Sequence, residues 1–106
     1  MKLATVKSTY KKINARNFGG VLVMPRILFS RSLDFDGQHS GAILEFSLRD
    51  VTGLDELREL VYHEQCHQYV DEFLRVDDNE HHGRKFVKTY NKFCNGITTD
   101  KDYSRC

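Results

Sequence analysis

The chain has 106 residues, of which 40% are hydrophobic, so it is long enough for one small globular domain and too hydrophobic to be disordered. No stretch is apolar enough for a signal peptide or a membrane span, and the three cysteines lack the paired spacing of a disulfide framework. We therefore expect a reduced, cytoplasmic protein that does not bind a membrane.

The net charge of +1 conceals a segregation of charge along the chain. Residues 1–33 contain seven Lys or Arg and no acidic residue, residues 34–80 contain thirteen acidic residues and three Arg, and residues 81–106 contain six basic and two acidic residues. If the two basic ends meet on one side of the fold, that side could attract phosphate, which would give weak nucleic-acid binding. The alternative is a set of solvated helix faces, and charge alone favours it.

The first half of the chain predicts a helix followed by a sheet. Apolar residues recur at helical spacing over residues 3–17, and Gly19 and Gly20 follow as a helix stop. Residues 21–24 and 26–30 are strand-like and are separated by Pro25, residues 34–41 are turn-rich, and residues 42–48 alternate in part. These runs predict a small three-stranded, mostly antiparallel sheet.

Two further helices are predicted in the second half, over residues 54–74 and 84–93. Thr52 and Asp55 fit a capping box at the start of the first of them. An acidic connection over residues 75–80 links the two, and its spacing does not match a calcium-binding EF-hand. The order of helix, sheet, helix and helix indicates an α+β domain.

The helix over residues 54–74 carries the motif H-E-x-x-H as His63, Glu64 and His67. Residues four apart lie on one helix face, so the two imidazoles can bind one zinc ion. Glu64 lies one step round the helix, where it can take a proton from a water on that ion. Cys66 lies away from the histidines on the helical wheel, which indicates a small buried side chain.

A catalytic zinc site needs a third protein ligand and leaves one position for water. The metzincin arrangement is excluded, because Val70 and Phe73 occupy the positions of its Gly and His. The remaining candidates follow the motif helix, and the residues alone do not choose between them: Asp77, Asp78, Glu80, His81 and His82.

The run from Leu60 to Phe93 resembles the SprT-like metalloprotease family, which includes the Spartan proteases that cleave DNA–protein crosslinks. In that family H-E-x-x-H is followed about fifteen residues later by H-G-x-x-F or H-G-x-x-W, and this chain has His82 and Gly83 with Phe86 in the matching places. The resemblance implies one zinc ion per chain bound by His63, His67 and His82, with Glu64 as the catalytic residue. It also implies a single zincin-like minimal protease domain over residues 1–106. Cys94 and Cys106 are too few for the cysteine-rich zinc ribbon that many members carry after this domain, so we expect a minimal form.

Two functions remain open. The first is a zinc metalloendopeptidase, with a protein or peptide substrate associated with DNA and with Glu64 as the general base. The second is a zinc-stabilised module that binds nucleic acid or protein without proteolytic turnover. For the first, residues 42–48 are a candidate edge of the substrate cleft, and the candidate donors to a developing oxyanion are Tyr62, Tyr69, Tyr90, His81 and Arg84.

Overall fold

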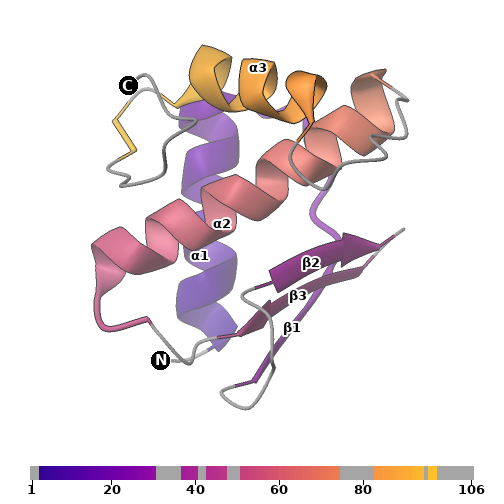
Figure 1. The fold of residues 1–106 in the computed structure, drawn as a ribbon. Helices are drawn as coiled ribbons and strands as arrows, with labels where there is room; N and C mark the ends of the chain where they lie inside the picture. Colours follow the sequence, from indigo (N-terminus) through magenta and orange to yellow (C-terminus); the bar gives the residue numbers. More distant parts are fainter. Residues whose placement is uncertain are drawn as a thin grey trace.

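The chain forms a small α+β domain in which one helix, α2 (Leu54–Tyr69), is central and contacts the other two helices and the sheet (Figure 1). The computed structural model describes residues 3–30, 37–40, 43–47, 51–74, 83–94 and 96–97. The elements in chain order are α1 (Leu3–Asn17), β1 (Arg26–Ser30), β2 (Gly37–Ser40), β3 (Ile43–Ser47), α2 (Leu54–Tyr69), the π-helical turn η1 (Val70–Leu74) and α3 (Arg84–Phe93).

Helix α1 has the predicted bounds, and it buries Val6, Tyr10 and Ile13 against the rest of the domain. Its end is a left-handed turn: Gly19 and Gly20 have φ values of 64° and 77°, and the Gly20 N–H donates to the Asn14 carbonyl at 2.8 Å. A side chain with a Cβ rarely adopts such φ values, so the two glycines end the helix as predicted.

The predicted strand over residues 21–24 is wrong, because this segment does not join the sheet. The side-chain amide of Asn14 takes the place of a strand partner for Leu22. Its Nδ2 donates to the Leu22 carbonyl at 2.8 Å, and its Oδ1 accepts from the Leu22 N–H at 3.0 Å. The backbone of Leu22 is therefore satisfied without a ladder, and its side chain is buried.

The sheet has three strands in the order β1-β3-β2, and it is mixed. Strand β3 pairs parallel with β1 (Arg26 opposite Ile43) and antiparallel with β2 (Gly37 opposite Phe46), so the prediction of a mostly antiparallel sheet is wrong. Strand β2 lies in the segment predicted as a turn. Its sequence, Gly-Gln-His-Ser, has no apolar alternation, so the period-two pattern gave no signal for it.

Helix α2 and η1 together cover residues 54–74, the extent predicted for the motif helix. The predicted capping box is wrong. The N-cap is Gly53, without a side-chain hydrogen bond, and the Thr52 hydroxyl donates to a Glu56 carboxylate oxygen at 2.9 Å. Leu57, Val61, Tyr62 and Cys66 of α2 have no exposed surface, which makes this helix the centre of the core. Its contacts with α1, β2 and α3 hold it from three directions (Figure 1).

Helix α3 also has its predicted bounds, and it packs on α2 through aromatic residues. The Tyr62 hydroxyl donates to the Tyr90 carbonyl at 2.6 Å, and the two rings meet edge to face at 4.7 Å between centroids. Just beyond the helix, Cys94 is buried, and Cys66 on α2 is a free, buried thiol. None of the helices in the described part of the chain combines the length and apolarity needed to cross a membrane.

Candidate metal centre

His63 and His67 lie one turn apart on α2, and both are partly buried. Their ring centroids are 5.0 Å apart, with an angle of 67° between the ring planes. The His63 side chain is only 12% exposed. Two imidazoles on one helix face, close together and shielded from bulk water, are suited to bind a single metal ion.

Glu64 places a buried carboxylate beside this pair. The side chain is 1% exposed, and its Oε2 is 3.9 Å from Nε2 of His63. That separation is too long for a direct hydrogen bond but short enough for a strong electrostatic interaction with a cation at the imidazoles. Burial of a carboxylate costs several kcal/mol unless nearby groups compensate its charge, and a metal ion on the histidines would contribute to that compensation.

Phe86 of α3 covers both histidines. Its ring stacks on His67 at 4.3 Å between centroids, with 29° between the planes, and contacts His63 at 4.9 Å. These contacts restrict the rotamers of the two imidazoles. Gly83, the N-cap of α3, precedes Phe86 by three residues, which is about 4.5 Å along a helix axis. The start of α3 therefore lies near the histidine pair.

All the candidates that the sequence offers for a third ligand lie outside the described residues: Asp77, Asp78, Glu80, His81 and His82. Within the ranges that the structure describes, no group of three or more His, Cys, Asp or Glu side chains is placed to hold a metal ion. The donor chemistry of His63 and His67 fits two positions of a three-ligand zinc site. Assignment of His82 as the third remains a prediction, and the position of Gly83 is consistent with it.

Two buried glutamines were not predicted from the sequence: Gln65 inside the H-E-x-x-H motif and Gln68 directly after it. Gln65 and Gln68 are fully buried on the side of α2 that faces α1. Gln65 Nε2 donates to the Tyr10 carbonyl at 3.1 Å, and Gln68 Nε2 donates to the Val23 carbonyl at 2.9 Å. The Tyr10 hydroxyl donates to Gln68 Oε1 at 2.5 Å. The sequence signal for them was a pair of amide side chains three positions apart, which places both on one side of the helix.

This network fixes the rotation of α2 about its own axis. A turn of the helix by one residue would move each side chain about 100° and break all three hydrogen bonds. Burial raises the pKa of Tyr10 well above its ordinary value, which keeps the hydroxyl protonated as a donor to Gln68. Gln65 and Gln68 thus act as positioning residues for the histidines on the opposite side of the helix.

Three of the described candidate oxyanion donors, Tyr62, Tyr69 and Tyr90, differ in their contacts. The Tyr62 hydroxyl already donates to the Tyr90 carbonyl. Tyr69 packs between Phe73 and Phe93, with 5.0 Å between centroids in each case. The Tyr90 ring lies 6.4 Å from that of His63, which places it beside the candidate centre.

Cys66 is a small buried side chain, as the helical wheel predicted. It is fully buried, and burial raises the pKa of its thiol well above the ordinary value. A protonated, buried thiol is a poor nucleophile.

Comparisons of the chain with protein-family models, with curated proteins and with solved structures give no match. The resemblance to the SprT-like family therefore rests on the motif residues and their spacing.

Proposed function

We propose that the chain is a zinc-dependent metallopeptidase that hydrolyses peptide bonds in proteins associated with DNA. The observation that carries the proposal is the placement of the buried Glu64 carboxylate 3.9 Å from His63, on the same helix as a second partly buried imidazole one turn away. Histidines in a purely structural zinc site need no adjacent general base, and such a site usually closes its fourth position with a protein ligand.

His63, His67 and, on this proposal, His82 would hold the metal. When bound, zinc supplies Lewis acidity toward a water molecule and toward the carbonyl of the scissile bond. Glu64 would accept the proton of that water at a carboxylate oxygen and then donate it to the departing amine. Phe86 keeps the imidazoles in place and excludes bulk water from their ring faces.

The sheet limits where an extended substrate could pair. Strand β3 is bonded on both sides, so Ile43–Ser47, the described part of the sequence-based candidate, does not form an open edge. The edge strand in contact with α2 is β2. An extended peptide that adds to this edge would lie along the motif helix, and we propose β2 as the substrate-binding edge.

Replacement of Glu64 by Gln tests the function. Glutamine has nearly the same shape, so packing and zinc binding should persist, but its amide cannot act as a base near neutral pH. We expect loss of peptide cleavage by about 10²–10⁴-fold, the usual contribution of a general base. Cleavage would be measured on an unfolded protein, with and without DNA, after zinc content and folding of the variant have been checked.

A folded, zinc-loaded Glu64→Gln protein with full proteolytic activity would refute the mechanism. If neither the wild type nor the variant cleaves any protein, the second function, a zinc-stabilised binding module, becomes the better account.

A further inference from the structure

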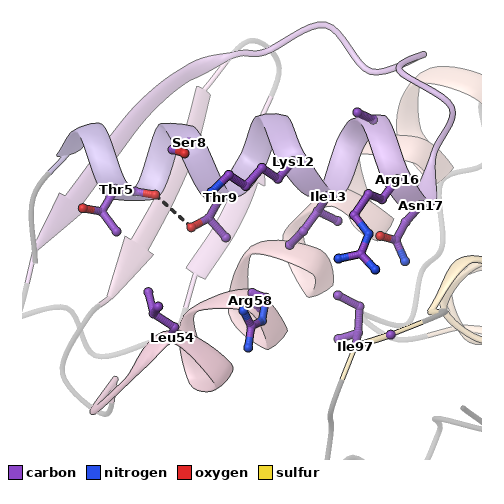
Figure 2. A pocket seen from close by; sticks show the side chains of 12 residues that line it. Thr5, Ser8, Thr9, Lys12, Ile13, Arg16, Asn17, Leu54, Arg58 and Ile97 are labelled. Carbon is purple, nitrogen blue, oxygen red and sulfur yellow. Dashed lines mark hydrogen bonds between the residues drawn. The ribbon is translucent and has the colours of Figure 1, made fainter.

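A groove of about 740 Å³ separates α1 from the first turns of α2, and it lies on residues that the proposed peptidase mechanism does not use (Figure 2). One wall is the face of α1 from Thr5 to Asn17, and the other is formed by Leu54 and Arg58. The turn at Gly96 and Ile97 also lines it. This volume falls within the range of ordinary small-molecule sites.

Three cationic side chains from two helices line the groove: Lys12 and Arg16 of α1, and Arg58 of α2. No carboxylate occurs among the described residues of the lining. Asp55, one turn before Arg58, forms an ion pair with it, but both side chains are well exposed and such a pair is weak in water. The groove therefore concentrates positive charge although the chain as a whole is nearly neutral.

Arg16 is the best-placed of the three cations. Its Nη2 atom would be 3.7 Å from a Cβ atom at position 96, so the guanidinium lies against the left-handed turn at Gly96. Figure 2 shows Arg16 extending from α1 toward the side where Arg58 and Ile97 lie. A guanidinium positioned in this way presents the planar set of donors that suits phosphate oxygens.

The remaining lining adds hydroxyl groups and apolar surface but no aromatic ring among the described residues. Thr5 and Ser8 provide hydroxyls, whereas the Thr9 hydroxyl donates to the Thr5 carbonyl at 2.8 Å. Nucleic-acid bases are usually held by stacking on aromatic side chains, which this groove does not offer in its described part. A phosphate group, and not a base, is the group that this lining can recognise.

We propose that the groove binds a phosphate-bearing ligand through its phosphoryl oxygens, with Arg16, Arg58 and Lys12 as the contacting cations. The source of the phosphate is either the backbone of a nucleic-acid strand or a free polyphosphate such as that of a nucleotide. The site is separate from the histidine pair and does not depend on zinc, so it stands whether or not the chain is a peptidase.

The test is fluorescence anisotropy with labelled oligothymidylate and oligoadenylate at 50 and 200 mM salt, and competition by pyrophosphate and ATP. Three phosphate contacts give a salt slope of about −2 for a single strand, so affinity should fall about 20-fold between these salt concentrations. Arg16→Gln and Arg58→Gln should each remove one contact and reduce that fall to about 7-fold. The two oligonucleotides should bind equally.

Two variants serve as controls. Lys11→Gln removes the same charge from an exposed position of α1 that does not line the groove, so it should change affinity much less than Arg16→Gln. Asp55→Asn removes the carboxylate that pairs with Arg58 and should strengthen binding.

Complete competition by pyrophosphate or ATP identifies a phosphoryl site open to both sources, and oligonucleotide binding without such competition identifies the nucleic-acid backbone. Binding of pyrophosphate or ATP in titration calorimetry, without oligonucleotide binding, identifies the free polyphosphate. The proposal is overturned if none of these ligands binds at low salt, or if Lys11→Gln weakens binding as much as Arg16→Gln and Arg58→Gln.

Discussion

Phe86 connects the packing of α3 to the proposed zinc site, and its replacement by Leu should affect both stability and metal affinity. The ring is fully buried and contacts His67, His63 and Tyr90, with centroid distances of 4.3, 4.9 and 5.9 Å. Truncation of a buried Phe to Ala costs about 3–5 kcal/mol. Leu keeps most of the volume, so we expect Phe86→Leu to lower the free energy of unfolding by about 1–3 kcal/mol through lost ring contacts.

Phe86→Leu should also weaken zinc binding, in addition to its effect on the stability of the zinc-free protein. Groups that orient metal ligands typically contribute about 10–100-fold to affinity, and the stacked Phe86 ring restrains both imidazoles. A tenfold weaker affinity reduces zinc-dependent stabilisation by about 1.4 kcal/mol at saturating metal. Urea unfolding of the zinc-free and zinc-loaded forms separates the two effects, and competition with a chelator gives the affinity directly.

Phe93→Leu is the matched control on the same helix. Phe93 packs against Phe18 and Tyr69, each at 5.0 Å between centroids, in an aromatic cluster away from the histidines. It should lower stability and leave zinc affinity unchanged. An unchanged zinc affinity in Phe86→Leu, or an equal loss in Phe93→Leu, would refute the argument that Phe86 positions the ligands.

Three further predictions concern the ligand set and the core. Binding of one zinc ion per chain should raise the melting temperature. His82→Ala should abolish this increase, and His81→Ala should keep it. The reverse result in zinc titrations would overturn the assignment of His82 as the third ligand. Gln68→Leu should lower the free energy of unfolding by about 2 kcal/mol, because it removes the buried hydrogen bonds of Gln68 with the Tyr10 hydroxyl and the Val23 carbonyl and leaves only the longer 3.4 Å bond between those two groups. Combination with Tyr10→Phe should cost less than the sum of the two changes in urea unfolding. Burial raises the pKa of the Cys66 thiol above its ordinary 9.0, so the contribution of this group to stability is complete below about pH 9 and is lost as the pH rises further. Iodoacetamide at neutral pH should label Cys66 only as fast as the chain unfolds. Rapid labelling of the folded protein would contradict its burial.

The helices were predictable from the sequence because the signals that define them are local. Leu3–Asn17 is ended by glycines with positive φ, and Arg84–Phe93 shows apolar residues at helical spacing. Strand β2 was not predictable in this way, since its four residues carry no apolar alternation and it is held by backbone pairing to β3. The parallel pairing of β1 with β3 is likewise a property of long-range packing that no local pattern encodes.

The histidine pair was predictable for a different reason, because its spacing is a property of the helix itself. His63 and His67 must share a face wherever the helix forms, and only the amphipathic context had to be inferred. The network of Gln65, Gln68 and Tyr10 could not be inferred, since a buried amide in a core helix does not reveal which distant carbonyl it will reach.

Helix α2 carries the candidate metal centre and is also the centre of the core, so the packing of the core pre-organises the two histidines. Its side toward α1 is held by the buried amides of Gln65 and Gln68, and its contact with α3 is held by the Tyr62 hydroxyl on the Tyr90 carbonyl. Because neither rotation nor translation of the helix is possible without breaking these bonds, His63 and His67 are oriented by contacts that do not involve a metal. A metal ion that binds there would spend little of its binding free energy on reordering α2, so more of that energy would appear as added stability of the folded chain.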